Sequence, residues 1–195
     1  IIKIKDQWTI PQYFETRLEL EKLELFCQDL PTDNVNLINP ENNPIDWDLV
    51  RSIPVGQQME MQTNKGKIII ELAIENSPGT ASYIYKLAKE GFYDGLRFHR
   101  VLSNFVIQGG DPFGNGTGAT EYSLRSEHSF LNYDEGAVGI ASAGKDTESC
   151  QLFITHNATP HLNRRYTIVG YVKEGMDVVH QVGIGDTIES IKILN

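Results

Sequence analysis

One stretch of the chain places a fixed cation among aromatic side chains and glycines: "RFHRVLSNFVIQGGDPFGNGTG", residues 97–118. Arg100 comes two positions after Phe98, and residues two apart in a β-strand point to the same face. By the same rule, Val106 and Gln108 share a face of the following strand. A guanidinium stays protonated, so Arg100 can donate hydrogen bonds beside an apolar pocket but cannot act as a base. The stretch by itself equally allows an arginine that only closes the edge of a sheet.

Other chemistries are poorly supported by the residue patterns. Gly114 to Ala119 match the dinucleotide pattern G-x-G-x-x-G/A, but "DPFG" before and "TEYSLRSE" after supply neither the strand nor the helix that this fingerprint needs. The five histidines show no H-E-x-x-H or similar ligand spacing, so no metal site is expected. Ser142 lies in "GIASAG", outside any G-x-S-x-G nucleophile elbow, and hydrolysis is therefore not supported.

Composition and charge restrict the class of protein. The chain has 195 residues, 40 % of them hydrophobic and 22 % charged, as in a soluble globular protein. Its formal charge of −9 argues against nucleic acid or an anionic membrane as the main partner, because both require clustered Lys and Arg. No apolar run approaches the ~20 residues of a membrane span.

The chain start and the cysteines give two further expectations. The sequence begins with Ile1 rather than Met, which indicates a processed product or an excised piece, so an export signal and the compartment stay open. Cys27 and Cys150 lie far apart and show no metal-ligand spacing. We expect two buried free thiols rather than a long-range disulfide.

The elements that must position the chemistry fall into two parts. Residues 1 to about 30 predict a helix with a wide apolar surface. A stretch rich in Pro and Asn then runs to Pro54 and predicts an irregular linker, held down by Trp47 and Val50. From Gln57 onward the pattern changes to short strands, which sets the predicted boundary between residues 1–56 and a main domain of residues 57–195.

Within the main domain, "QMEMQT" and "GKIIIELAI" predict a hairpin that turns at Asn64-Lys65-Gly66. A helix is predicted from Ser77 to Gly91, with Asn76 and Ser77 as caps, and a second short helix over residues 175–182. Further strands are predicted near residues 97–101, 105–108, 136–141, 151–155, 167–172 and 187–193. Because helices are absent between most strands, we expect a mainly β fold: a closed eight-stranded antiparallel β-barrel with two helices, plus the N-terminal helical extension.

Three blocks in order and register resemble the cyclophilin family of peptidyl-prolyl cis–trans isomerases. They are "GFYDGLRFHRVLSNFVIQGGDPFGNGTG", "GAVGIASAGKDTESCQLFIT" and "HLNRRYTIVGYVKEGMDVV". The resemblance covers the chain from about Gln57 to its end and leaves the N-terminal part outside. It implies an isomerase that rotates X–Pro peptide bonds and assists protein folding. It also implies proline-containing peptide segments or unfolded proteins as partners, and no cofactor.

The resemblance also implies which residues form the site. Arg100 stands at the catalytic arginine, with Phe105 and Gln108 beside it. The implied substrate-binding residues are Val106, Gly116, Ala141, Ser142, Ala143, Gln151, Phe153, His161, Leu162 and Tyr166.

Several residues depart from the family's pattern. His161 stands where some members carry Trp, which implies weak or no binding of cyclosporin. Ser142 replaces a frequent Asn, at a position where the family uses the backbone to pair with substrate. Val106 replaces a common Met and Tyr166 a common His, and both keep the character of the pocket. Asn163-Arg164 replaces Asp-Gly, which predicts a differently shaped turn.

Two other functions remain possible from the sequence. The chain could be a scaffold or chaperone module that binds proline peptides with little turnover, or a barrel that binds a small molecule. Retention of Arg100, Phe105 and Gln108 together favours the enzyme.

Overall fold

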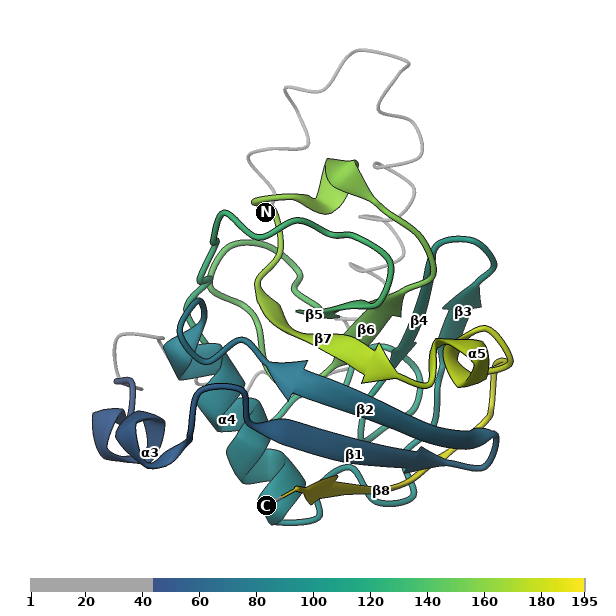
Figure 1. Ribbon diagram of the computed structural model, residues 1–195, viewed down its shortest axis with the longest axis horizontal. Coiled ribbons are helices and arrows are strands. Elements are labelled where there is room, and N and C mark those ends of the chain that lie inside the picture. Colours follow the sequence, from purple (N-terminus) through teal and green to yellow (C-terminus); the bar gives the residue numbers. More distant parts are fainter. Residues whose placement is uncertain (1–43, 195) are drawn as a thin grey trace, which may run out of the picture. The chain divides into compact units, whose positions relative to one another are not determined.

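The computed structural model describes residues 44–194 (Figure 1). All described residues belong to one compact unit. The helix predicted over residues 1–30 and Cys27 lie outside the described part. Cys150 is a buried free thiol, as expected.

The elements of the described residues follow the predicted pattern of short strands with few helices. The predicted strands and both predicted helices of the main domain are present, with small differences in their bounds. In chain order the elements are α3 (Trp47–Ser52), β1 (Gln58–Thr63), β2 (Gly66–Leu72), α4 (Pro78–Lys89), β3 (Arg100–Leu102), β4 (Val106–Gly109), β5 (Ala137–Ile140), β6 (Leu152–Thr155), a 3₁₀ helix (Pro160–Leu162), β7 (Ile168–Glu174), α5 (Met176–Val179) and β8 (Ile188–Ile193).

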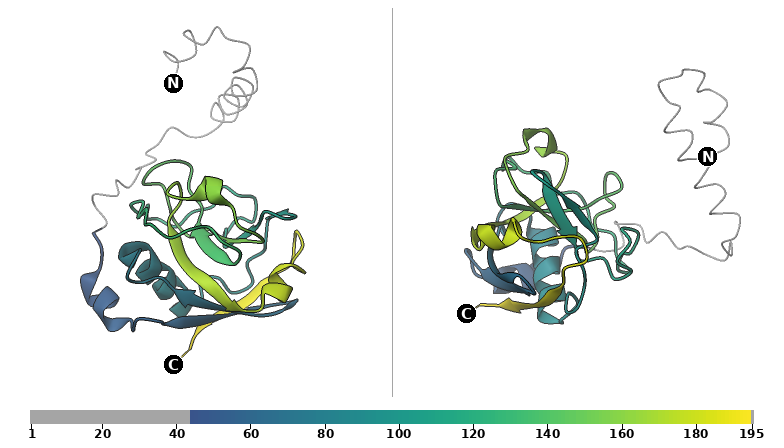
Figure 2. Two further views of the ribbon diagram at one scale, coloured as in Figure 1. Left: turned by 45° about the horizontal axis from the view of Figure 1, so that its top comes forward. Right: turned by 90° about the vertical axis from the view of Figure 1, so that its right-hand side faces the viewer.

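The sheet is an open half-barrel, so the prediction of a closed barrel is wrong. Its strand order is β3-β4-β6-β5-β7-β2-β1-β8, and the two edge strands β3 and β8 form no ladder with each other. The chain just before β3 does contact the chain around the start of β8, through an isolated bridge between Arg97 and Thr187. Four backbone hydrogen bonds support this contact: Gly95 N–H to the Ile188 carbonyl (2.8 Å), Ile188 N–H to Leu96 (2.7 Å), Phe98 N–H to Asp186 (2.9 Å) and Gly185 N–H to Phe98 (2.9 Å). β3 itself begins at Arg100, beyond these contacts, and pairs only with β4. The strong curvature of the sheet is visible in Figures 1 and 2.

The hairpin β1–β2 follows from the alternation of its side chains. Met59 and Met61 point inward and are fully buried, whereas Gln58, Glu60 and Gln62, which alternate with them, are part exposed. Asn64 and Lys65 form the turn, and the hydroxyl oxygen of Thr63 accepts hydrogen bonds from the backbone N–H of Lys65 and of Gly66, both at 3.1 Å. This local geometry is what the sequence pattern predicts.

Helix α4 packs against β7 and β8 and adds Ile84 and Leu87 to the main core (Figure 1). Its N-terminus differs from the prediction, because the Ser77 hydroxyl donates to the Ile168 carbonyl (2.8 Å) and does not cap the helix. The carboxylate of Glu127 instead accepts hydrogen bonds from the free backbone N–H groups of Gly79 and Thr80, in the first turn of the helix. An acidic group at this end also suits the helix dipole.

The predicted linker is not irregular throughout, because α3 forms within it. The Asp46 carboxylate caps α3 by accepting from the N–H of Asp48 (3.1 Å) and Leu49 (3.0 Å). Val50 and Leu49 pack onto a small core next to α4, as expected for Val50. Trp47 is 51 % exposed, which contradicts its predicted role in holding the segment down.

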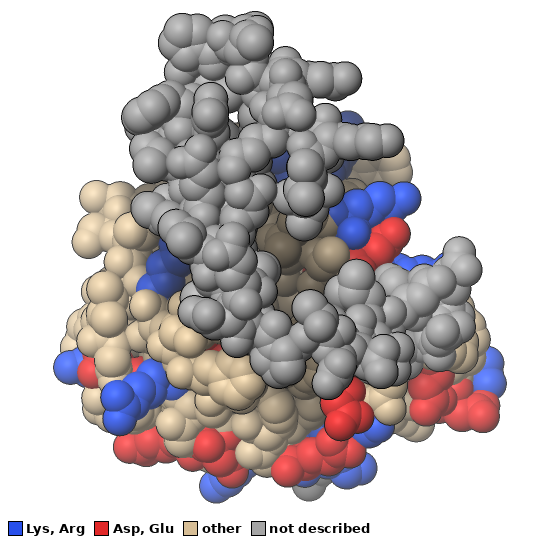
Figure 3. All heavy atoms as spheres, turned by 180° about the vertical axis from the view of Figure 1, so that it is seen from behind, with Lys and Arg blue, Asp and Glu red and all other residues tan. Residues whose placement is uncertain are grey.

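The surface of the described residues carries both signs of charge. On the face shown in Figure 3, acidic and basic side chains are interspersed along the visible part. Among residues 44–194, no helix has both the length and the apolar character to cross a membrane.

Candidate active site

The sheet register brings three predicted site residues side by side from distant parts of the chain. Arg100 on β3 is paired with Gln108 on β4, and Gln108 is paired with Phe153 on β6. Side chains directly opposite across antiparallel strands lie on one face, so a cation, an amide and an aromatic ring meet there. Phe98 does not share this face, contrary to the expectation, because it precedes β3 and is buried in the main core.

A chain of hydrogen bonds runs from the arginine across the sheet. The guanidinium Nη1 of Arg100 donates to Oε1 of Gln108 (3.1 Å), whose Nε2 donates to Oε1 of Gln151 (2.9 Å). Gln151 Nε2 then donates to the carbonyls of Gly116 (3.0 Å) and Gly118 (2.8 Å). The side-chain amides of Gln108 and Gln151 thus each use both their oxygen and their nitrogen in hydrogen bonds. The guanidinium is thereby held in one orientation, while its side chain remains exposed to solvent.

An apolar hollow of about 200 Å³ opens beside the guanidinium. Its lining residues come from β3, β4, β6, the 3₁₀ helix and three loops: Arg100, Phe105, Val106, Gln108, Ala141, Ser142, Phe153, Leu162 and Tyr166. Phe153, 6 % exposed, packs in one cluster with Val106 and Leu162. The guanidinium carbon of Arg100 lies 6.0 Å from the ring centre of Phe105. The hollow suits one small apolar ring, and the guanidinium of Arg100 offers a hydrogen-bond donor at the edge of the hollow.

The ring of Phe153 is held by the predicted Tyr166 and by Tyr133 and Gly139, which the sequence reasoning did not name. Tyr133 stacks on it (5.5 Å between ring centres, 17° between planes), and Tyr166 meets it edge-on (5.8 Å, 86°). The buried Tyr133 hydroxyl donates to the Thr167 carbonyl (3.1 Å). Gly139 pairs with Phe153 across β5 and β6, and a Cβ there would overlap the Phe153 ring and the Tyr133 hydroxyl. A glycine inside a predicted strand is the signal that could have indicated this close approach.

A second hollow of about 240 Å³ continues from the first and shares Gln108, Ala141 and Ser142 with it. The other predicted residues Gly116, Ala143 and Gln151 line it. Gly118 and Thr147 are also among its lining residues, and the sequence reasoning did not name them. Of all the predicted site residues, only His161 lines neither hollow. Its ring stacks on Phe105 at 5.5 Å and is exposed.

The loop that carries Gly116 is shaped by a buried carboxylate. Burial by itself raises the pKa of Asp111, but the backbone N–H groups of Phe113, Gly116 and Asn115 donate to it and hold the pKa below its ordinary value. A Cβ at Gly118 would collide with this carboxylate. The glycines therefore shape the loop that presents its carbonyls to Gln151, and no phosphate cradle is formed.

The comparisons with known proteins agree with this geometry. The profile of the family described as cyclophilin type peptidyl-prolyl cis-trans isomerase/CLD matches residues 58–195. The chain is 45 % identical over 147 residues to peptidyl-prolyl cis-trans isomerase ppi1 of Schizosaccharomyces pombe, covering 70 % of this chain and 95 % of that protein. It is 43 % identical over 129 residues to peptidyl-prolyl cis-trans isomerase B of Bacillus subtilis, covering 65 % and 90 %.

Among solved structures, the fold is similar to a Cryptosporidium parvum cyclophilin type peptidyl-prolyl cis-trans isomerase, with a TM-score of 0.67 and 29 % sequence identity. The match covers 71 % of this chain and 98 % of that one. A structure of the same protein in the presence of the dipeptide Ala-Pro has the same TM-score of 0.67.

Proposed function

The chain belongs to the cyclophilin-type peptidyl-prolyl cis–trans isomerase family, and from this premise we propose that Arg100, Phe105 and Gln108 carry its reaction. Its substrates are proline-containing peptides and proteins. The observation that supports the assignment is the guanidinium of Arg100, oriented by Gln108 at 3.1 Å over an apolar hollow of about 200 Å³.

The reaction requires only a rotation. An X–Pro bond isomerises slowly because amide resonance must be broken, with a barrier of about 20 kcal/mol and relaxation over tens of seconds. No bond between heavy atoms forms or breaks. As the amide twists, the prolyl nitrogen becomes pyramidal and gains a localised lone pair. A donor aimed at this lone pair stabilises the twisted state and leaves the planar states unaffected, which is the condition for catalysis.

The residues of the groove divide this work. Phe153, Val106 and Leu162 hold the proline ring, and the exposed N–H groups of Arg100 donate to the prolyl nitrogen. The bond to Gln108 fixes the guanidinium before substrate arrives, so that little reorganisation is needed. The second hollow, walled by residues 141–143, receives the residues before proline. Rotation then takes place about one restrained bond.

The assignment is tested by comparing wild type with Arg100→Ala in a protease-coupled or NMR-exchange assay on a short proline peptide. Loss of a single transition-state donor typically lowers the rate by about 10²–10³-fold. Arg97→Ala is the matched control, because Arg97 is an exposed arginine in the same segment that lines neither hollow. Equal rates for wild type and Arg100→Ala would remove the proposed role.

The alternative is a proline-peptide-binding module with little turnover. It predicts that a peptide titrates into the groove while its cis–trans exchange stays at the uncatalysed rate. We further propose that the isomerase domain occupies residues 57–195 and that cyclosporin binds weakly, because His161 is imidazole in place of a larger indole. His161→Trp then increases cyclosporin affinity in a titration, and an unchanged affinity would contradict this proposal.

A further inference from the structure

The turn between Leu162 and Tyr166 carries two arginines at one end of the hollow beside Arg100. Leu162 and Tyr166 both line this first hollow, and neither lines the second. Arg164 and Arg165 lie between them, in a turn closed by a bond from the Arg165 N–H to the Leu162 carbonyl (3.0 Å). Because neighbouring Cα atoms are about 3.8 Å apart, both arginines lie at the end of the first hollow that the second does not share.

Arg164 has an uncommon backbone conformation and stacks on an exposed aromatic ring. Its φ is +59°, in the left-handed region that residues other than glycine rarely adopt. Its guanidinium carbon lies 4.9 Å from the ring centre of Phe130, an arrangement that favours one position of the cation. Leu131, the neighbour of Phe130, packs against the apolar cluster that contains Leu162. We call Phe130, Arg164 and Arg165 the basic rim of the groove.

The same turn is more positive than the family's pattern. Asn163-Arg164 stands where that pattern has Asp-Gly, so one negative charge is absent and one positive charge is added. The Asn163 amide has a structural role: its Oδ1 accepts from the Tyr133 N–H (2.7 Å), and its Nδ2 donates to Oδ1 of Asn132 (3.2 Å). Arg164, in contrast, keeps a strained backbone at the edge of the groove, where strained residues are often functional.

The groove itself carries a positive charge. Among the described residues that line its two hollows, Arg100 is the single charged residue, and none is a carboxylate. Arg164 and Arg165 are exposed and form no ion pair with any residue of 44–194. At physiological ionic strength, exposed charges more than about 8 Å apart are largely screened. A peptide in the groove therefore meets these cations rather than the net charge of −9 of the whole chain.

The carboxylates of the neighbouring loop do not neutralise the basic rim. Asn132, which contacts the turn, is followed by Asp134 and Glu135, and neither forms an ion pair with an arginine of the rim. Glu135 Oε1 instead lies 3.3 Å from Nε2 of His180.

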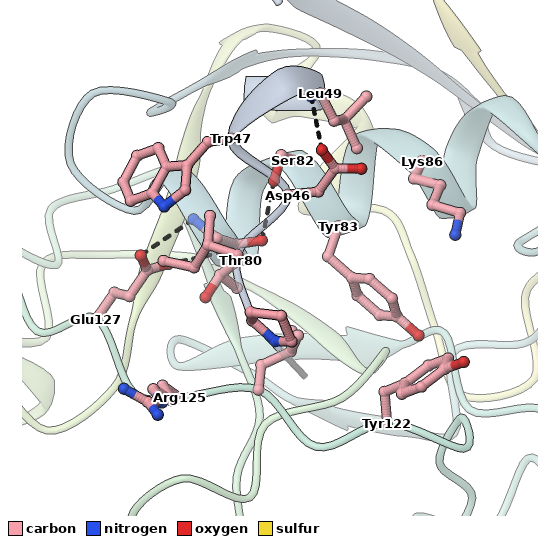
Figure 4. A pocket seen from close by; sticks show the side chains of 14 residues that line it. Asp46, Trp47, Leu49, Thr80, Ser82, Tyr83, Lys86, Tyr122, Arg125 and Glu127 are labelled. Carbon is pink, nitrogen blue, oxygen red and sulfur yellow. Dashed lines mark hydrogen bonds between the residues drawn. The ribbon is translucent and has the colours of Figure 1, made fainter. Parts of the chain in front are cut away.

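A larger pocket around Trp47 shows no such charge bias (Figure 4). Its volume is about 620 Å³, and it lies beside α3 and α4, sharing no lining residue with the groove. Its lining contains two carboxylates, Asp46 and Glu127, and two cations, Lys86 and Arg125, so its formal charge is zero. The positive charge therefore distinguishes the groove and its rim from this other hollow of the domain.

We propose that the basic rim gives this isomerase a preference for substrates with an acidic side chain in the two positions after proline. This inference rests on the proposed function, in which the residues before proline occupy the second hollow. The peptide then leaves the first hollow at its other end, where the turn with Arg164 and Arg165 lies. A glutamate or aspartate there accepts hydrogen bonds from guanidinium groups, whose planar shape matches a carboxylate. Charge complementarity thus favours an acidic residue over a neutral or basic one.

The test measures cis–trans exchange by NMR with the full chain at several peptide concentrations, so that kcat/KM is obtained without a protease. The charged probe is acetyl-Ala-Ala-Pro-Glu-Glu-Ala-amide, and acetyl-Ala-Ala-Pro-Gln-Gln-Ala-amide is its uncharged counterpart. Wild type should prefer the charged probe about threefold at low ionic strength, as expected for exposed ion pairs, and less at high ionic strength.

Variants of the rim and a matched control locate the source of this preference. Arg164→Gln combined with Arg165→Gln should abolish the preference through a higher KM for the charged probe. Lys89→Gln combined with Lys192→Gln removes the same charge from exposed positions that line neither hollow, and should keep the preference. Arg164→Gly should weaken the preference without lowering the melting temperature, because glycine adopts a positive φ without strain.

The results separate the acidic preference from the isomerase function. If neither probe exchanges faster than in free solution, both proposals fail. If wild type accelerates both probes equally, the isomerase function holds and the acidic preference is refuted. A preference that survives in the variant with Arg164→Gln and Arg165→Gln would also refute the role of the basic rim. So would an equal preference for acetyl-Glu-Glu-Ala-Pro-Ala-Ala-amide over its Gln-Gln counterpart, because these glutamates precede proline and lie away from the rim.

Discussion

The hydrogen bond between Arg100 and Gln108 makes a quantitative prediction about how the guanidinium is oriented. The bond is 3.1 Å long and involves a charged donor, a class worth about 1.5–3 kcal/mol when well shielded. Because the Arg100 side chain is exposed, we expect about 1–2 kcal/mol, which corresponds to a loss of roughly 5- to 30-fold in kcat/KM. The perturbation is Gln108→Leu, which leaves an apolar side chain at this position and removes the acceptor.

A double-mutant cycle separates orientation of the arginine from direct contact with substrate. If Gln108 acts through Arg100, adding Gln108→Leu to Arg100→Ala should reduce kcat/KM little further, because there is no guanidinium left to orient. The protease-coupled assay gives kcat/KM for wild type, both single variants and the double variant. Thermal unfolding of each variant checks that the fold is retained.

The same four kcat/KM values can contradict the proposed role of Gln108. If the two substitutions multiply in their effects on kcat/KM, Gln108 contributes independently of Arg100, and its bond to the guanidinium is incidental. A matched variant, Gln151→Leu, removes the acceptor for Gln108 Nε2. It should give a smaller loss than Gln108→Leu, since the direct bond to Arg100 remains. A larger loss would place the main support of the site at the loop carbonyls of Gly116 and Gly118.

Three further predictions follow from other parts of the site. Gly139→Ala should destabilise the fold by about 1–3 kcal/mol and raise KM, because the added Cβ displaces Phe153. Gly183→Ala, where a Cβ has room, should change neither stability nor KM. Denaturant unfolding measures the stability of both variants, and peptide titration measures their binding. Asp111 contributes stability that is complete above its unfolded pKa of 3.8 and is lost as pH falls through its lower folded value. At pH 7 the free energy of unfolding of Asp111→Asn should therefore be lower than that of wild type. In urea titrations this difference in free energy should disappear below about pH 4, and a difference that stays constant with pH would contradict the assignment. Burial raises the pKa of Cys150 to about 11, so in a Cys27→Ser background its thiol should react with a disulfide reagent at pH 8 only after unfolding.

The local elements of this protein are encoded in short runs of sequence. The alternation of Met59 and Met61 with polar residues predicts β1, and Asn64-Lys65-Gly66 predicts the turn that follows. Pro78 and Gly91 bracket α4. These signals depend on backbone preferences and on the period of a strand or helix, which neighbouring residues determine. The three family blocks likewise name all nine residues that line the first hollow, but not Gly118 and Thr147 in the second.

The tertiary structure decided which of these residues act together. Gln108 and Gln151 are 43 positions apart, and only the strand order and register bring them to 2.9 Å. The need for Gly139 arises from Phe153 and Tyr133, which reach it from other segments. Glu127 caps a helix 47 residues away, a role that no local pattern indicates.

The openness of the sheet has the same origin. Each predicted strand is correct in its own neighbourhood, and the local pattern suggested a closed barrel. Closure depends on whether β3 and β8, at opposite ends of the strand order, form a ladder, and in the folded chain they form none. The docking of α3 beside α4, which creates the pocket around Trp47, is also a packing event between distant segments. Sequence periodicity determines what each segment can form, whereas contacts between distant segments depend on the packing of the whole chain and are settled only when it folds.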